Sequence, residues 1–446
     1  MRALLQWRYV LGRASLALLA LVVLSFSVAS AETVAVDSYF DGHDVSLVES
    51  TADRTVIEYR IGTFSAESVE IDGEVYHEIL LDGESNMQER GYPGLPDIAR
   101  SIVIPDDAEM SVRVLSSHYV DVPDMSVAPS KGVITRNIDP ATVRYAFSPL
   151  YDEDAWYPEK LAYARKPYIM RDVRGLTVVV NPFRYNPATQ TLRVYDRIVI
   201  EVTPAGPGKA NVLDRRPVKV VEEFRRIYES HFLNYGAAPE LRYSSVGEVG
   251  NMLVICYDSF MTNMEPFVEW KKQMGVPCEM VSVTTAGGTA SGIQSYIQNY
   301  YDTNGLAFVL LVGDAAQVPT LTGGGGASDP SYSLVAGSDS YPDLFVGRFS
   351  AESGSEVDTQ VLRSVEYEKL PQSGAGWYHK GTGIASDEGT GDDGEYDWEH
   401  MDNIRTDLLG FTYTEVDQIY DPSASASQVT NALNEGRSII NYTGHG

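Results

Sequence analysis

The chain has 446 residues, which is too long for one ordinary domain and predicts two or three. Its hydrophobic fraction of 43% and its five tryptophans allow sizeable cores, which excludes a disordered protein. The formal charge of -28 argues against nucleic acid and anionic membrane surfaces as partners, because both carry negative charge themselves.

Residues 1–31 have the pattern of a secretion signal. Three arginines accompany an apolar run over residues 16–28, and Ala29-Ser30-Ala31 forms a small-x-small cleavage site. A membrane anchor is the alternative, but the run is short for a span and no later segment is suitable. We therefore expect a bacterial-type exported protein, at the cell surface or outside the cell. Its two cysteines, Cys256 and Cys278, lie in apolar runs, which favours buried thiols over a mutual disulfide.

The segment from residue 32 to residue 205 alternates short apolar and polar runs between turn residues. Residues 55–59 and 176–180 have strand patterns, and residues 192–195 and 198–202 predict a following strand pair. The pattern predicts a β-rich, antiparallel, sandwich-like domain. It contains no histidine cluster, carboxylate pair or nucleophile signature, so we expect a binding or folding role.

One loop motif in this half is more specific than the strand pattern. G-Y-P-G-L-P at 91–96 is followed by I-V-I-P at 102–105. This arrangement resembles propeptides of the gingipain type, in which a G-x-P-x-L-P loop precedes a strand that ends in I-P. Residues 206–250 then predict a helical segment between two linkers, with cleavage expected near Arg242, where the chain is polar and glycine-flanked.

The pattern changes over residues 251–446. Continuous apolar runs at 252–256 and 306–312 predict strands that are covered on both faces, and amphipathic helices occur between such runs. Strands that alternate with helices predict an α/β domain with a mainly parallel sheet flanked by helices.

Four motifs in this half occur in gingipain order and at gingipain-like spacing. They are L-L-V-G-D at 310–314, V-G-R-F-S-A-E-S at 346–353, I-A-S-D-E-G at 384–389 and N-Y-T-G-H-G at 441–446. The chain therefore resembles the gingipain family of secreted cysteine peptidases. The resemblance implies a multidomain zymogen with a β-rich propeptide and a caspase-like catalytic domain. It also implies protein or peptide substrates and an intramolecular contact between the two parts.

A cysteine peptidase needs a thiolate, an imidazole that protonates the leaving amine, and often a third group that orients the ring. The resemblance implies that His445 is the general acid/base and that Glu388 is the acidic third member, with the adjacent Asp387 as the alternative. In the family the nucleophile follows the histidine, and neither Cys256 nor Cys278 matches its position. We therefore expect a chain truncated within its catalytic domain, and inactive as it stands.

The resemblance also implies a structural calcium site. Calcium prefers six to eight hard oxygens, both carboxylate and carbonyl, and two acidic segments occur at 338–343 and 389–400. The implied ligands are the side chains of Asp314, Asp339, Asp343, Glu395 and His400 and the carbonyls of Ala336 and Tyr341. The alternative is a solvated acidic surface, and at position 343 the family pattern has a longer glutamate.

Asp397 matches the position where arginine-specific family members keep a carboxylate at the floor of the primary pocket. A buried carboxylate pairs bidentately with a guanidinium, which implies a preference for arginine before the cut. The alternatives are a solvated aspartate and another calcium ligand.

Two other functions compete with the peptidase. One is an inactive binding or inhibitory protein that works through its β-rich half. The other, a structural β-protein, leaves the motifs of Asp314, Glu388 and His445 unexplained.

Overall fold

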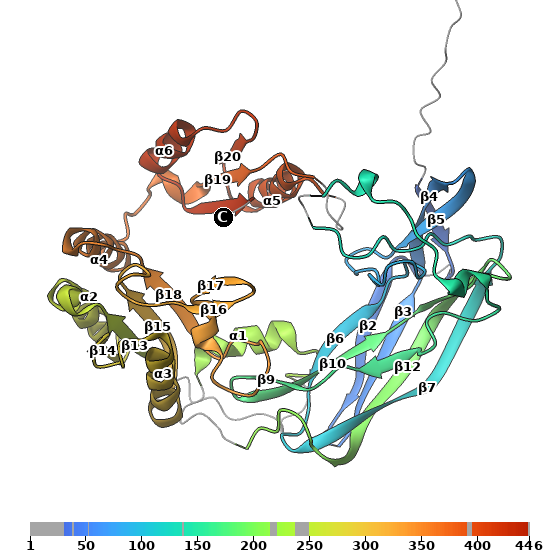
Figure 1. Cartoon of the computed structure of the whole chain (residues 1–446), viewed down its shortest axis with the longest axis horizontal. Coiled ribbons are helices and arrows are strands. Elements are labelled where there is room, and N and C mark those ends of the chain that lie inside the picture. The colour runs from blue at the N-terminus through green and yellow to red at the C-terminus, as the bar shows by residue number, and fades with distance from the viewer. Residues whose placement is uncertain are drawn as a thin grey trace, which may run out of the picture.

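The computed structural model describes residues 31–37, 40–51, 53–135, 138–214, 221–236, 249–389 and 395–444. Most of the predicted signal segment, Arg242 and His445 lie outside these ranges. Figure 1 shows a strand-rich first half and an α/β second half, with the helix α1 between them. Within the described ranges, no helix combines the length and the apolar character that a membrane span needs.

The first half consists of antiparallel sheets, as the alternating pattern predicts. The largest sheet runs in the order β11 (Phe183–Asn186), β12 (Thr191–Pro207), β3 (Thr55–Ile61) and β2 (His43–Ser50), and β7 (Ala108–Val122) also pairs with β12. A second sheet has β6 (Ile98–Val103), β10 (Val173–Val180) and β8 (Ala162–Ala164), with β9 (Tyr168–Met170) also on β10. A third contains β1 (Ala31–Ala35), β4 (Thr63–Ile71) and β5 (Glu74–Leu80).

One hydrophobic core joins these three sheets. Apolar residues on one face of each strand meet there, including Ile57, Phe64 and Val178, because side chains alternate between the two faces of a strand. The G-Y-P-G-L-P loop adds the fully buried Leu95 to this core, and Gly91 takes a φ of 87°, which favours glycine. The short 3₁₀ helices of this half are η1 (Pro140–Thr142) and η2 (Pro149–Asp152).

The helix α1 (Glu222–His231) covers the boundary between the two halves. Its buried Phe224 and Tyr228 pack in a cluster that contains Met170 and Val173 from the first half and Ala307 from the second. The helix is therefore part of the interface between the halves, whereas the sequence of residues 206–250 predicts only a helical segment between two linkers.

The second half begins with a parallel sheet in the order β14 (Cys278–Ser282), β13 (Asn251–Cys256), β15 (Leu306–Val312) and β18 (Phe345–Phe349). The helix α3 (Ala290–Asn304) packs on one face. The helices α2 (Met261–Gln273) and α4 (Gly354–Lys369) pack on the other. Smaller elements are the hairpin of β16 (Leu321–Gly323) and β17 (Gly326–Ser328) and the 3₁₀ helices η4 (Asp258–Phe260), η5 (Pro330–Ser333) and η6 (Gly376–His379).

A second parallel sheet follows, with the order β20 (Glu415–Tyr420), β19 (Lys380–Ala385) and β21 (Ile439–Thr443). The helices α5 (Asp397–Phe411) and α6 (Ala426–Glu435) accompany it. The prediction of parallel strands is confirmed, and the strands fall into two sheets. An alternation of strands and helices is the same whether the strands form one sheet or two. The sequence pattern therefore does not predict that the strands form two sheets.

Both cysteines are free and buried. Cys278 pairs in register with Met252, whereas Cys256 pairs with Ser282, so the two thiols lie at opposite ends of neighbouring strands. The expectation of buried thiols is confirmed.

Candidate active site

The carboxyl ends of β19 and β21 bring two of the sequence motifs together. Ala385 is the register partner of Thr443, and the N–H of Ser386 donates to the carbonyl of Thr443 at 3.0 Å. Parallel strands end at the same edge of a sheet, where open α/β sheets place their chemistry. Glu388 follows β19 at this edge. His445 lies outside the described residues, but Gly444, which precedes it, continues directly from β21.

The hydroxyl of Ser386 organises the residues around this edge. It accepts a hydrogen bond from the N–H of Glu388 at 3.2 Å and donates one to the carboxylate of Asp397. Glu388 is half-buried and Asp387 is exposed. The I-A-S-D-E-G motif thus connects the predicted acidic member to Asp397 through one serine, a link that sequence reasoning did not identify.

Asp397 is the first residue of α5, and its side chain is 1% exposed. The N-terminus of a helix carries a partial positive charge, which stabilises a carboxylate placed there. Asp397 is therefore neither a loop residue nor solvated. Its predicted role at the floor of a pocket stays a prediction.

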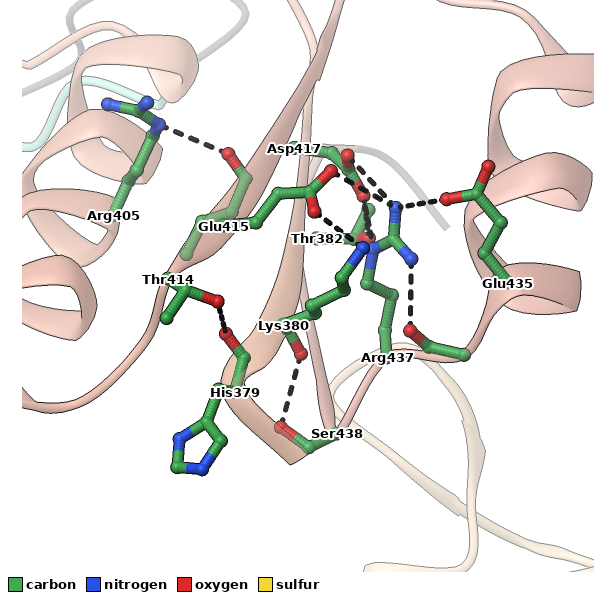
Figure 2. Close-up of polar contacts among 12 residues, drawn as sticks. His379, Lys380, Thr382, Arg405, Thr414, Glu415, Asp417, Glu435, Arg437 and Ser438 are labelled. Carbon is green, nitrogen blue, oxygen red and sulfur yellow. Dashed lines mark hydrogen bonds and ion pairs between the residues drawn. The ribbon is translucent and has the colours of Figure 1, made fainter. Parts of the chain in front are cut away.

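A charged network holds the opposite, amino-terminal edge of the same sheet (Figure 2). Arg437 lies just before β21, and its guanidinium donates from Nε to Asp417 Oδ2 at 2.6 Å and from Nη2 to Asp417 Oδ1 at 3.2 Å. Thr382 of β19 donates to the same carboxylate at 2.7 Å, and Ser438 N–H donates to the carbonyl of Lys380 at 2.9 Å. The network fixes the register of β21 against β19, and with it the start of the segment that contains His445.

The pKa of Asp417 reflects two opposing effects. Partial burial raises it, while the hydrogen bonds from Arg437 and Thr382 and the positive charge of Arg437 lower it further than burial raises it. Asp417 therefore stays ionised and paired at neutral pH. Sequence reasoning missed both Arg437 and Asp417. Asp417 does not stand out locally, because β20 also contains Glu415 and Gln418.

The thiols of the chain are not suited to nucleophilic attack. Burial raises the pKa of Cys256 to about 12 and that of Cys278 to about 11. A nucleophile must be a thiolate at working pH, so these buried thiols are poor candidates for it, and the expectation that the nucleophile lies elsewhere stays a prediction.

The residues predicted to bind calcium occupy three separate places. Asp314 follows β15 and accepts a hydrogen bond from the Ser350 hydroxyl at 3.0 Å. Asp343 precedes β18, which is parallel to β15, so these two carboxylates lie beyond opposite ends of the sheet. Glu395 and His400 lie at α5 beside the second sheet, where His400 Nδ1 is 3.0 Å from Glu395 Oε2.

Asp339 and Asp343 belong to loop 335–343, and their carboxylates already accept hydrogen bonds from backbone N–H groups. Asp343 Oδ2 accepts from the N–H groups of Val335 and Ala336 at 2.9 and 2.7 Å. Asp339 Oδ1 accepts from the N–H of Tyr341 at 3.1 Å. Among the residues that the structure describes, no three His, Cys, Asp or Glu side chains gather as metal ligands would. The seven residues do not fit one calcium site in this arrangement.

Two family models match successive parts of the chain. Residues 38–237 match the family model Propeptide_C25, and residues 246–446 match the model of peptidase family C25. Gingipain R2 of Porphyromonas gingivalis is 34% identical over 410 residues, which cover 90% of this chain and 55% of the relative. Gingipain R1 is 34% identical over 412 residues, 90% of this chain and 41% of the relative. The chain thus spans about half the length, or less, of these relatives.

Solved structures give matches of limited extent. The Arg-specific cysteine proteinase gingipain R matches with a TM-score of 0.43 and 34% identity, over 46% of this chain and 49% of that one. A complex of gingipain pro- and mature domains from P. gingivalis matches with a TM-score of 0.40 and 33% identity, over 43% of this chain and 98% of that one. With both family models in register along the sequence, the chain belongs to the gingipain family, peptidase family C25, as a propeptide region followed by a peptidase region.

Proposed function

We propose that this chain is the propeptide and the first part of the catalytic domain of an exported cysteine endopeptidase. The observation that carries the proposal is the adjacency of β19 and β21, which brings Glu388 and the residue before His445 to one carboxyl edge. The secretion pattern of residues 1–31 supports export. The β-rich half is the inhibitory propeptide of the zymogen, and the substrates are proteins or peptides.

Each residue at this edge has a role in peptide hydrolysis. A cysteine other than Cys256 and Cys278 attacks the scissile carbonyl as a thiolate. His445 holds that thiolate ionised and then protonates the leaving amine, while Glu388 orients the imidazole. Ser386 positions the loop of Glu388 through its hydrogen bond to the backbone.

Arginine is the proposed residue before the cut. Asp397 is buried, sits at a helix N-terminus and is held by Ser386, so its carboxylate is fixed in one orientation. A fixed carboxylate binds the planar guanidinium fork through two hydrogen bonds, which a lysine ammonium cannot reproduce. The matching gingipain R carries the description Arg-specific, which favours the same preference here.

The test uses a longer product of the same gene that includes the next cysteine. We expect thiol-dependent hydrolysis after arginine, loss of at least about 100-fold in kcat in His445→Ala, and a weaker arginine preference in Asp397→Asn. Asp407→Asn is the matched control, because Asp407 lies on the same helix as Asp397 but is exposed.

Two results would contradict the proposal. Hydrolysis that survives His445→Ala removes the proposed acid/base, and cleavage after apolar residues removes the role of Asp397. A longer product with no hydrolysis at all would favour the second candidate, an inactive binding or inhibitory protein.

A further inference from the structure

The turn between β9 and β10 carries a buried arginine from the propeptide into the peptidase half. Arg171 is completely buried and takes a φ of 56°, which is uncommon for a residue with a side chain. Its Nη1 donates to the carbonyls of Leu306 at 2.7 Å and Asp343 at 3.0 Å. Its backbone N–H donates to Asp343 Oδ1 at 2.7 Å. One propeptide residue thus bonds to the segments that begin both β15 and β18.

Aromatic rings enclose the same guanidinium. Its carbon lies 5.0 Å from the ring centre of Phe224 in α1 and 5.3 Å from that of Tyr301 in α3. Nε and Nη2 have no hydrogen-bond partner among the described residues. Cation–π contacts therefore stabilise these parts of the guanidinium, and the site is selective for a flat cation.

Loop 335–343 of the peptidase half receives the rest of the β9–β10 hairpin. Asp339 Oδ2 accepts from the N–H of Ile169 at 2.9 Å. The rings of Tyr341 and Tyr168 stack with centres 3.8 Å apart. Ser338 donates from both its N–H and its hydroxyl to Asn211 Oδ1, at 3.0 and 2.9 Å. Two carboxylates of the loop thus bind alternate backbone N–H groups, those of residues 169 and 171.

This contact lies away from the candidate active site. Leu306 begins β15 and Asp343 precedes β18, so the arginine enters at the amino-terminal edge of the first parallel sheet. Glu388 lies at the carboxyl edge of the other sheet. The contact therefore does not imitate a bound substrate.

We propose that the β9–β10 turn and loop 335–343 form a docking site that keeps the propeptide on the peptidase half after the linker between them is cut. The inference rests on the proposed function in that it assumes a processed zymogen. Without Arg171 the carbonyls of Leu306 and Asp343 would be buried without that donor, and an unpaired buried polar group is strongly unfavourable. The docking site and the active site then contribute separately to retention of the propeptide.

The experiment introduces a recognition sequence for a specific protease into residues 237–248 of the full chain. After cutting, the two halves should elute together and separate slowly. Arg171→Met should speed dissociation about 100-fold, since removing one partner of a buried charged contact acts mainly on the dissociation rate. Asp343→Asn, a change in the peptidase half alone, should also speed dissociation by at least about 10-fold.

Arg184→Met is the matched control. Arg184 is half-buried, and its guanidinium donates to the carbonyls of Pro158 and Trp156, which both lie in the propeptide and outside the docking contact. It should lower the Tm of the propeptide and leave the dissociation rate of the folded complex within about threefold of the wild-type rate. Circular dichroism of each cut complex confirms that the variants are folded.

Two outcomes would overturn the inference. One is a wild-type complex whose halves separate as soon as the linker is cut. The other is a folded Arg171→Met or Asp343→Asn complex that dissociates at the wild-type rate. Neither measurement uses peptidase activity, so a longer product without activity would contradict the proposed function and leave this result standing.

Discussion

Two buried arginines are stabilised by different partners. Arg437 forms a bidentate pair with Asp417, so the charges cancel locally. Arg171 donates to carbonyls and lies between two rings. A planar guanidinium suits both environments because its donors point in fixed directions and its faces are weakly hydrated. The first arginine holds a sheet together, whereas the second joins two halves of the chain.

Removing the first pair should loosen the sheet locally. The side chain of Arg437 is 2% exposed, so Arg437→Met leaves the Asp417 carboxylate partly buried without its cation. We expect a loss of about 2–3 kcal/mol in the free energy of local opening of β19 and β21. Hydrogen exchange of these strands measures it. Lys380→Met breaks the more exposed pair with Glu415 and should change this free energy by less than about 1 kcal/mol. Equal effects of the two variants would contradict the special role of Arg437.

Single elements were the scale at which the sequence was most informative. The amphipathic pattern predicted helices between the strands, and in α3 the residues Ile293 and Ile297 pack on the sheet together, as a repeat of 3.6 residues per turn requires. The same reasoning could not predict that Tyr301 of this helix contacts Arg171, since local periodicity carries no information on distant partners. Family motifs indicated Glu388 and the segment before His445. They did not indicate the Ser386 link or the division of the strands into two sheets.

The helix α1 places a titratable histidine at the interface between the halves. His231 is its last residue, lies beside Tyr341, and has its Nε2 2.6 Å from the hydroxyl of Tyr168. Burial lowers the pKa of His231, so the folded state favours the neutral ring. The corresponding stability is present above the unfolded pKa of about 6.5 and is lost as the pH falls through that value toward the lower folded pKa.

We therefore expect the Tm of the wild-type chain to fall relative to that of His231→Gln between about pH 7.5 and about pH 5.5. Asp343, whose pKa burial raises to about 7, acts in the opposite direction and equally in both chains. His231→Gln, which keeps a hydrogen-bonding group but does not titrate, should fall less steeply over this range. His118→Gln is the control, because His118 is largely exposed on the far strand β7. Thermal melts followed by circular dichroism give the comparison. An unchanged slope in His231→Gln would assign the pH dependence to other groups.

At the scale of the whole molecule, one loop has two competing assignments. The family resemblance implies that Asp339 and Asp343 bind calcium, together with the carbonyls of Ala336 and Tyr341. In the structure, Asp339 and Asp343 accept N–H groups from Ile169 and Arg171 of the propeptide. An N–H group that points at a carboxylate oxygen occupies a position that a cation would need, and the Arg171 guanidinium adds a positive charge nearby. The propeptide therefore uses carboxylate oxygens of Asp339 and Asp343 that the calcium hypothesis assigns to the ion.

Calcium should consequently weaken the hold of the peptidase half on its propeptide. In the chain cut within residues 237–248, millimolar calcium should speed separation of the halves several-fold, whereas magnesium at equal ionic strength should not, because the smaller ion demands stricter octahedral geometry. Glu395→Gln changes a predicted ligand outside the loop and should leave the calcium effect intact. The dissociation rate, followed by size-exclusion chromatography after dilution, gives the result. If calcium slows separation or has no effect, loop 335–343 does not exchange the propeptide for calcium, and the ligands implied by the resemblance do not act together there.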